Sequence, residues 1–380
     1  MQTTILLAGA GHTHLLAAPA LARALDSRAR VALVAPSGRL LYSGMMPGWI
    51  AGQYRFDDCA IDLRSVTDAA GVEWLEDTLV DVDFRGRRAL GASGRGYAYD
   101  VISLNVGSAN LTGALAADPG VRVLAAKPFA EFVAAWNAVL AQPGRRCCAV
   151  IGGGAAAVEI ALALAALARG DGPLAGSSVT LVTHGSRLMA GQSHIAGLLA
   201  RAALAGRGVR AVLGHSYRGV TGRALMLERR NGAEPLAQPI EADLVVVANG
   251  ARAPAWLTLA ARRDGLPVAP DGGVAVDATM RAIGTDGVYA SGDCASFVGI
   301  DVPKSGVYAL RQAPALAATL AARVDGDAPG VPYAPQRRSL ALLNRCDGSA
   351  IGLWGPLGFA GRWVWRWKDR IDRRFIQRFR

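Results

Sequence analysis

The sequence has 380 residues, of which 41 are Lys or Arg and 30 are Asp or Glu, giving a formal net charge of +11. That length suffices for two or three domains with cores of their own. No run of about 18 apolar residues is free of both charges and turn residues, so we expect no membrane-spanning helix. The apolar stretch that begins at Ile5 is too short for a signal peptide. We therefore expect the protein in the cytoplasm or, peripherally, at the inner face of the membrane.

The first predicted element is a strand, turn and helix over residues 5–25. An apolar strand ends at Ala8, Gly9 and Gly11 form the turn, and a helical pattern follows. This order is typical of a dinucleotide-binding turn, where glycines let a pyrophosphate approach a helix N-terminus. His14 stands where the motif expects a third glycine. The loop alone therefore leaves a plain glycine turn open, and we expect His14 to serve helix packing.

The same pattern returns in "CCAVIGGGAAAVEIALALAALA" at 147–168. Gly152 and Gly154 form the turn, and Ala157 is an accepted variant at the third position. Two later strands also match each other, "VISLNVGSAN" at 101–110 and "ADLVVVANGARAP" at 242–254. This duplication indicates two nucleotide-binding units. The predicted fold class is α/β, with two Rossmann-like dinucleotide-binding domains on parallel sheets and a small C-terminal segment.

Neither unit has the acidic residue that usually binds a ribose at the end of the second strand. The first unit reads Ala35-Pro36-Ser37 there, and the second reads Thr183-His184. Ser37 or backbone groups would take the ribose contacts in the first unit. In the second, Arg187 leaves NADPH open beside NADH, because a cation can meet a 2′-phosphate.

Two carboxylates near predicted turns have two interpretations each. Glu159 lies in the first turns of the second helix, where it either stabilises the helix dipole or takes part in function. Asp293 follows Gly292 at the end of an apolar strand, where it either caps a helix or reaches a polyol. The cysteines form no C-x-x-C pair and no cluster with zinc spacing, so we expect no dithiol relay and no metal site.

The chain ends in a basic segment, 362–380, with eight Arg or Lys and two Asp. Trp363, Trp367, Ile371 and Phe375 recur every four residues, which predicts a helix with an aromatic stripe. Two interpretations stay open: the stripe contacts an anionic membrane surface, or it docks on the protein itself or on a second subunit as in a homodimer. No nucleic-acid module accompanies the charge, so we expect no nucleic-acid partner.

Two glycine loops, two strand-end turns and the late Gly292-Asp293 together resemble the two-dinucleotide-domain flavoproteins of the pyridine nucleotide-disulfide oxidoreductase superfamily. The likeness covers roughly residues 3–325. The segments "YSGMMPGWIAGQY" (42–54), "PKSGVYALRQAP" (303–314) and "WRWKDRIDRRFIQRF" (365–379) are similar to a narrower subgroup. Its members are type II NADH dehydrogenase-like flavoproteins associated with selenophosphate synthetase.

The resemblance implies an FAD-binding domain at 1–112 and 265–328, an NAD(P)H-binding domain at 113–264 and a C-terminal segment at 329–380. It implies catalytic roles for Glu159, near the nicotinamide, and for Lys304, near the charge of the reduced flavin; a solvated loop cation is the other interpretation of Lys304. The implied cofactor-binding residues are Gly9, Gly11, His12, Ala35, Ser37, Pro47, Val80, Asn105, Gly107, Gly152, Gly154, Ala157, Asn249, Gly250, Gly292, Asp293, Ser305, Gly306 and Val307.

The function that this resemblance implies is an FAD-dependent oxidoreductase that takes a hydride from NADH or NADPH. Electrons would pass to a quinone-like acceptor without a redox-active disulfide, although Val307 departs from the residue usual in quinone reductases. One alternative is a flavin-binding partner protein of selenophosphate synthetase with little dehydrogenase activity. The other is a sulfide or selenide:quinone oxidoreductase, which the cysteine pattern weakens.

Overall fold

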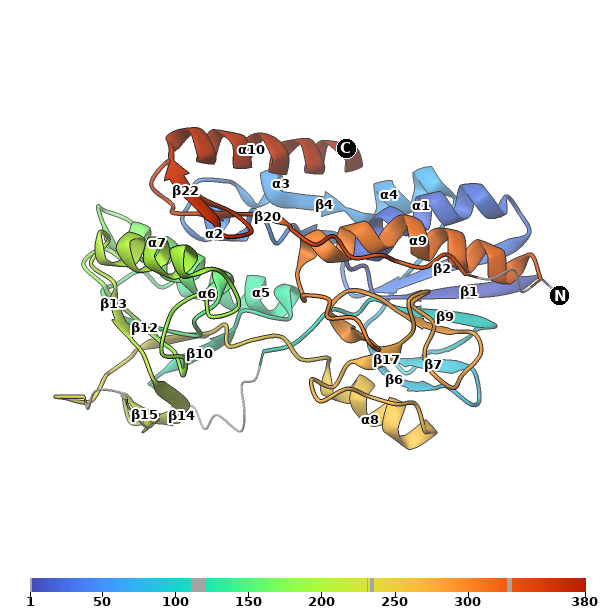
Figure 1. The fold of residues 1–380 in the computed structure, drawn as a ribbon, viewed down its shortest axis with the longest axis horizontal. Coiled ribbons are helices and arrows are strands. Elements are labelled where there is room, and N and C mark those ends of the chain that lie inside the picture. The colour runs from blue at the N-terminus through green and yellow to red at the C-terminus, as the bar shows by residue number, and fades with distance from the viewer. Residues whose placement is uncertain (1, 111–119, 231, 233–235, 327–329) are drawn as a thin grey trace.

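Two five-stranded parallel sheets form the centre of the computed structural model, which describes residues 2–110, 120–230, 232, 236–326 and 330–380. In Figure 1 the first sheet lies on the right and the second on the left, with the C-terminal segment above them. The predicted domain boundaries at 112/113 and 328/329 lie outside the described residues. The α/β fold class with parallel Rossmann-like sheets is confirmed.

The first sheet places its earliest strand in the middle. Its order is β18 (Val288–Ala290), β9 (Val101–Leu104), β1 (Thr3–Ala8), β2 (Ala29–Ala35) and β5 (Glu73–Glu76). Residues alternate between its two faces because successive side chains of a strand point to opposite sides. Ile5 and Leu7 are buried in the core under α1 (His12–Leu25), α4 (Leu63–Ala70) and α9 (Gly306–Val324). Leu6 and Ala8 belong to the core on the opposite face.

That opposite face is covered by two small sheets, one antiparallel and one parallel, and by one helix. They are β6 (Leu79–Asp83), β7 (Arg88–Gly91), β8 (Gly96–Ala98), β17 (Val274–Val276), β19 (Ala295–Phe297) and α8 (Ala255–Asp264). Leu257 and Ala261 of α8 share a core with Leu6 of β1, and Arg263 forms an ion pair with Asp81 of β6 at 2.8 Å. The helix thus packs on the first sheet although 113–264 was assigned to the second unit. We propose moving that boundary to about residue 252.

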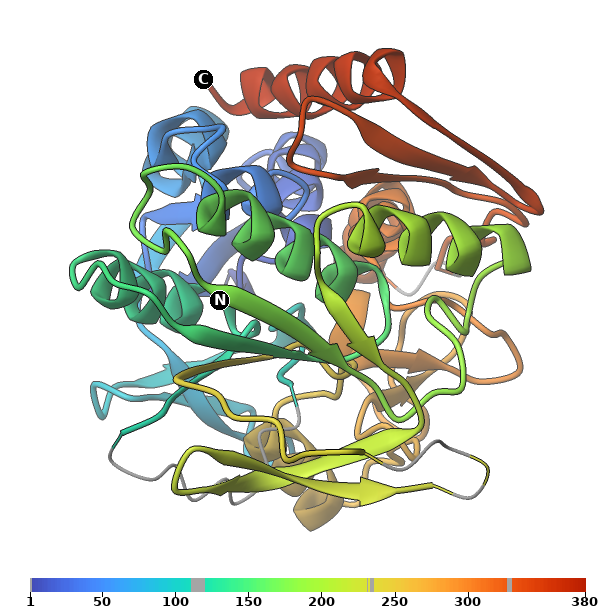
Figure 2. The ribbon, with the colours of Figure 1, turned by 90° about the vertical axis from the view of Figure 1, so that its left-hand side faces the viewer.

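The second sheet also has its glycine-loop strand in the middle, but one of its edge strands precedes that strand in the chain, whereas the counterpart β18 comes last in the first sheet. The second sheet runs β10 (Arg122–Ala125), β16 (Leu244–Val247), β11 (Cys147–Ile151), β12 (Ser178–Val182) and β13 (Arg210–Val212). Helices α5 (Phe129–Leu140), α6 (Ala155–Ala168) and α7 (His194–Ala205) pack on one face, and the hairpin β14 (His215–Thr221) and β15 (Ala224–Arg229) covers the other. Figure 2 shows this sheet edge with its hairpin below and the C-terminal segment above. Strands β9 and β16, which the sequence matched, occupy equivalent places.

The C-terminal segment is an antiparallel sheet followed by a helix. It consists of β20 (Leu340–Asn344), β21 (Ala350–Trp354), β22 (Leu357–Gly361), α10 (Arg362–Ile376) and the turn η2 (Gln377–Phe379). Beneath it lies an excursion of the first unit with β3 (Arg39–Leu41), α2 (Met46–Ile50), α3 (Phe56–Cys59) and β4 (Ala60–Asp62). No helix of the described residues is long and apolar enough to span a bilayer.

His14 is fully buried and fixes the first loop to the sheet. A carbonyl can only accept, so Nδ1–H donates to Gly9 O at 2.7 Å and Nε2 accepts from the Ser103 hydroxyl at 2.9 Å. The ring thus replaces the missing third glycine as a packing element between loop and strand. Burial lowers its pKa from the ordinary 6.5 to about 4, so the ring is neutral at pH 7.

This burial makes stability depend on pH. A histidine whose folded pKa is depressed stabilises the fold above its unfolded pKa, and that stability is lost as the pH falls from 6.5 towards 4. Between pH 7.5 and 5 the His14 share of the loss is about 2 kcal/mol. We predict that the free energy of unfolding, measured by urea titration, falls less between pH 7.5 and pH 5 in His14→Gln than in the wild type. The exposed His194→Gln is the control, and an identical pH slope for His14→Gln and wild type would contradict the assignment.

Candidate dinucleotide and electron-transfer site

The carboxyl edge of the first sheet is held together by one amide side chain. Asn105, directly after β9, accepts from the His14 backbone N–H at 3.3 Å and donates to Ser291 O at 2.9 Å. Gly9 has φ +86°, and a Cβ there would lie 2.7 Å from Asn105 O. A Cβ on Gly11 would overlap the Asn105 amide oxygen. Both glycines are therefore required by the close approach of β9, and they leave the loop surface free of side chains.

Helix α9 closes the same edge from above. Gly292 has φ +64°, and a Cβ there would lie 2.5 Å from Asn105 Nδ2. Its N–H donates to the buried Gln312 Oε1 at 2.7 Å, which ties the end of β18 to α9. On the facing side Thr13 Oγ1 donates to Ala309 O at 2.9 Å. The start of α9 therefore lies beside the start of α1.

His12, the first residue of α1, faces that junction. Its Nε2 is 3.3 Å from Ser43 Oγ, and a Cβ on Gly306 would be 3.5 Å from the same nitrogen. The pKa of His12 is lowered to about 4, mainly by burial and in smaller part by nearby Lys127, against the raising effect of Asp293. Helices α1 and α9 both begin without a side-chain cap, at Gly11 and Ser305. Two adjoining uncapped helix N-termini suit an anionic ligand.

Asp293 lies on this edge as the sequence predicted, but its charged partner was not predicted. Its Oδ2 accepts from Lys127 Nζ at 2.6 Å and from the Ser108 hydroxyl at 2.8 Å. Burial alone would raise the pKa of Asp293, but Lys127 and Ser108 hold it below its usual value. Lys304 instead pairs with Asp271 at 2.7 Å and donates to Asp293 O at 2.8 Å. The sequence analysis missed Lys127 and Ser108, and paired neither with Asp293.

The other residues predicted for the first unit lie around this edge in different roles. Ala35 ends β2 and is buried, while the Ser37 hydroxyl is engaged with the backbone of Arg39. Gly107 has φ +72° and no neighbour within 4 Å of a Cβ position. Val80 lies apart on β6 and is 40% exposed, and Val307 is exposed in the first turn of α9.

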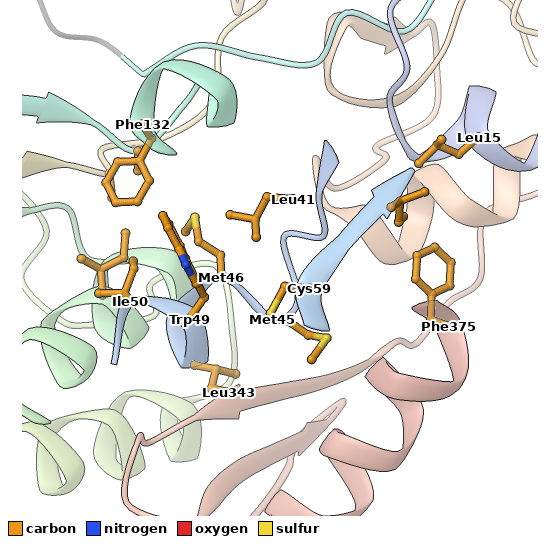
Figure 3. Close-up of a cluster of buried hydrophobic side chains, with 14 of the residues drawn as sticks. Leu15, Leu41, Met45, Met46, Trp49, Ile50, Cys59, Phe132, Leu343 and Phe375 are labelled. Carbon is orange, nitrogen blue, oxygen red and sulfur yellow. The ribbon is translucent and has the colours of Figure 1, made fainter. Parts of the chain in front are cut away.

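The predicted segment 42–54 is the core junction between the units. Pro47 opens α2 and is buried with Met45 and Trp49. Figure 3 shows this cluster between side chains of the first unit, the second unit and the C-terminal segment, with labels on Leu15, Leu41, Met45, Met46, Trp49, Ile50, Cys59, Phe132, Leu343 and Phe375. The segment therefore fixes how the three parts meet.

The second loop has a similar geometry to the first, but here a main-chain oxygen takes the place next to the first glycine. Gly152 has φ +141°, and a Cβ there would overlap Ala248 O at the end of β16. Gly154 has an ordinary φ of −86° and nothing within 4 Å of a Cβ position, and α6 begins there without a side-chain cap. Ala157 is buried under the turn. The open space over Gly154 fits a phosphate that approaches the helix start.

Asn249 and Gly250 lie where the chain crosses between the sheets. Gly250 has φ +104°, and its carbonyl accepts from Asn110 Nδ2 at 2.6 Å. Ala109 pairs with Arg252 in a short antiparallel bridge. The two strand-end turns that the sequence matched therefore contact each other.

Glu159 points to the C-terminal sheet. Its Oε1 accepts from the Asn344 N–H at 2.6 Å, and Asn344 Nδ2 donates to Gln53 Oε1 at 2.7 Å. Burial raises the pKa of Glu159 to about 7, against a smaller lowering by Lys368 and the Asn344 hydrogen bond. The carboxyl therefore exchanges a proton near neutral pH, at a junction of all three parts of the chain.

Helix α10 docks through a polar and aromatic face. Lys368 and Asp372 form a buried ion pair at 2.6 Å, and Lys368 also donates to Gly44 O at 2.6 Å. Phe375 is buried 4.6 Å from the Tyr42 ring. Trp363 and Trp367 remain 57% and 40% exposed.

The predicted single stripe is therefore wrong, because a spacing of four drifts about 40° per step on a 3.6-residue helix. Over the three steps from Trp363 to Phe375 the drift reaches about 120°. Phe375 consequently faces the core, while the tryptophans face outward.

The cysteines are all free thiols, and the four buried ones are held in the protonated form. Burial raises the pKa of Cys59 and of Cys148 to about 12 and that of Cys294 to about 11. Since the thiolate is the nucleophile, these sites do not suit disulfide or sulfide chemistry.

Together these features fit two dinucleotides. In each sheet the strand order reverses beside the strand that carries the glycine loop, and ligands bind at such switch points. The sequence profile of the pyridine nucleotide-disulphide oxidoreductases matches residues 3–315. No curated protein matches the sequence.

Several solved structures share the fold. The sulfide:quinone oxidoreductase of Aquifex aeolicus is 16% identical with a TM-score of 0.80, over 100% of this chain and 91% of that one. NDH2 of Plasmodium falciparum, in complex with NADH, is 12% identical with a TM-score of 0.80, over 99% and 97%. A ferredoxin reductase of Rhodopseudomonas palustris is 23% identical with a TM-score of 0.71, over 92% and 82%.

The open space over Gly154 generates a prediction. Gly154→Ala adds a methyl group that meets no protein atom but occupies the space a pyrophosphate needs, so KM for NAD(P)H should rise about tenfold or more. The free energy of unfolding should change by less than about 1 kcal/mol, as for a helix-cap substitution. Steady-state kinetics and urea unfolding measure the two effects.

Gly152→Ala is the contrasting variant, because its Cβ would collide with Ala248 O and should destabilise the fold itself. An unchanged KM in Gly154→Ala would show that phosphate does not bind over this turn.

Proposed function

The chain belongs to the pyridine nucleotide-disulphide oxidoreductase family, and on that basis we propose that it is an FAD-dependent oxidoreductase that takes a hydride from NADH or NADPH and reduces a quinone-like acceptor. FAD and NAD(P)H are the cofactors of this family. The observation that supports the proposal most is the pair of glycine-turn cradles, each on the central strand of a five-stranded parallel sheet. The cysteines are free, and four of the five are buried, which favours a mechanism without a redox disulfide.

In this proposal the first cradle, with Gly9, Gly11, Asn105 and Asp293, holds FAD, and the second, with Gly152 and Gly154, holds the nicotinamide dinucleotide. FAD and the nicotinamide dinucleotide, when bound, would supply the hydride and electron-transfer chemistry. The chain contributes side-chain-free loop surfaces and uncapped helix N-termini for the phosphates.

Glu159 and Lys304 have different roles in the proposed mechanism. Glu159, with a pKa raised to about 7 by burial, can hold or release a proton at the oxygen that Asn344 does not occupy. Lys304 already shares its charge with Asp271, so we propose that it positions the Asp293 backbone rather than meeting the flavin directly.

A cleft of about 720 Å³ between α1, α9, the 331–336 segment and the end of α10 is our proposed acceptor site. Leu16, Leu310 and Phe375 line it with apolar surface. Tyr333 is 5% exposed, and neither its hydroxyl nor the Gln336 amide has a hydrogen-bond partner among the described residues. Those unsatisfied donors suit the carbonyl oxygens of a quinone.

The outward face of α10 supports peripheral membrane contact. Trp363, Trp367 and Ile371 are exposed there, with Arg366 and Arg370 beside them. Exposed aromatics among arginines are typical of helices that lie on an anionic membrane. Because Phe375 and Arg378 of the same segment line the cleft, a lipid-borne acceptor would enter beside this face.

The selenophosphate-linked partner protein is the second candidate function, and no contact in the described residues favours it or the homodimer. The two candidates differ in hydride transfer. Anaerobic mixing of the FAD-loaded protein with NADH or NADPH should bleach the flavin band rapidly, and a short-chain quinone should restore it. If neither nucleotide bleaches the flavin band, the dehydrogenase function is rejected and the partner-protein function is the one that stands.

We predict that Tyr333→Phe slows reoxidation by the quinone about tenfold while leaving flavin reduction unchanged, because one buried donor is lost from the acceptor cleft alone. Stopped-flow absorbance separates the two half-reactions. Tyr217→Phe is the matched control, since Tyr217 also carries a buried, unpartnered hydroxyl but lies on the β14 hairpin. Equal quinone rates in Tyr333→Phe and wild type would exclude this hydroxyl from the acceptor site.

The double variant Trp363→Ser, Trp367→Ser should release the protein from anionic lipid vesicles in sedimentation assays, because both exposed rings of α10 are lost. Leu198→Ser, on the exposed surface of α7, serves as the control. Vesicle binding that persists in the tryptophan variant would assign these rings to a protein partner instead.

A further inference from the structure

Lys127 belongs to the second unit, but its charge reaches the carboxyl edge of the first sheet. It follows β10, and its main chain is tied to the second sheet because Ala126 N–H donates to Val247 O at 2.9 Å. Its ammonium instead crosses to the first unit. There it donates to Asp293 Oδ2 at 2.6 Å and to Ser108 Oγ at 3.0 Å.

The pair lies largely out of water. The Lys127 and Asp293 side chains are 26% and 12% exposed, and Ser108 is buried. A carboxylate with so little solvent is costly unless a cation compensates it. The Lys304 ammonium contacts only the main-chain oxygen of Asp293 and is paired with Asp271. Lys127 is therefore the cation that neutralises the Asp293 carboxylate.

The ion pair also borders the start of α1. His12, the first residue of that helix, interacts electrostatically with both groups: Asp293 raises the pKa of His12 and Lys127 lowers it. Since burial keeps His12 neutral at pH 7, it adds no charge of its own. With Lys127 present the local charges sum to zero, and without it a lone carboxylate would face the place where the helix N-terminus is to receive a pyrophosphate.

We propose that Lys127 is a positioning residue of the FAD site, which the second unit supplies to the first and which acts through Asp293. It holds Asp293 in place and cancels its charge, so that an anionic dinucleotide can bind next to a carboxylate. The proposal rests on FAD binding at the first loop and is independent of hydride transfer or of any acceptor.

The test is FAD titration of the apoprotein, followed by quenching of flavin fluorescence. Lys127→Met should raise the Kd for FAD at least tenfold, and Lys127→Arg should restore most of the affinity. Arg218→Met, which removes an exposed ion pair with Glu228 on the hairpin, is the control and should bind as wild type does. Circular dichroism melting of each apoprotein verifies that the variants are folded.

The decisive variant removes both charges. If Lys127 acts by compensating Asp293, then Asp293→Asn weakens FAD binding in the wild type but strengthens it in the Lys127→Met background. The reversal of sign is not expected of a lysine that only supports the fold. Wild-type affinity in folded Lys127→Met, or an Asp293→Asn loss of equal size in both backgrounds, would overturn the proposal. Failure of the wild type to bind FAD would instead reject the cofactor assignment itself.

Discussion

The close approach of Asn105 to three glycines determines the architecture of the first nucleotide edge. Its side chain joins the end of β9 to the first turn of α1 and to the end of β18. Those bonds form only because Gly9, Gly11 and Gly292 have no Cβ where the amide and its backbone lie. The same absence of side chains leaves a bare loop at the helix start. Packing within the protein and access for a phosphate thus both require glycine at these positions.

The second edge meets the same requirement at Gly152, where the Ala248 main-chain oxygen excludes a Cβ. The first edge is further held by Gln312, which binds the end of β18 to α9, and by the Lys127–Asp293 pair. These contacts around the first loop suit our proposal that FAD stays bound there.

Features carried by local sequence were predictable, whereas features carried by distant partners were not. Both glycine turns, the parallel sheets and the match of β9 with β16 follow from short patterns that specify strand, turn and helix. The partner of Asp293 lies 166 residues away, and nothing near Lys127 signals its target. The contact between Glu159 and Asn344 spans 185 residues. The helix predicted within the basic segment 362–380 is present as α10 (Arg362–Ile376), but which side of it is buried depends on the loop at 42–54 on which it docks.

The most direct test of the account is the nucleotide content of the purified chain. Gel filtration followed by absorbance and mass spectrometry should find one FAD per chain. Calorimetric titration of that holoprotein with NAD(P)H analogues should then find one further site. Two FAD molecules per chain, or an analogue that displaces FAD instead of adding to it, would contradict the assignment of different dinucleotides to the two cradles.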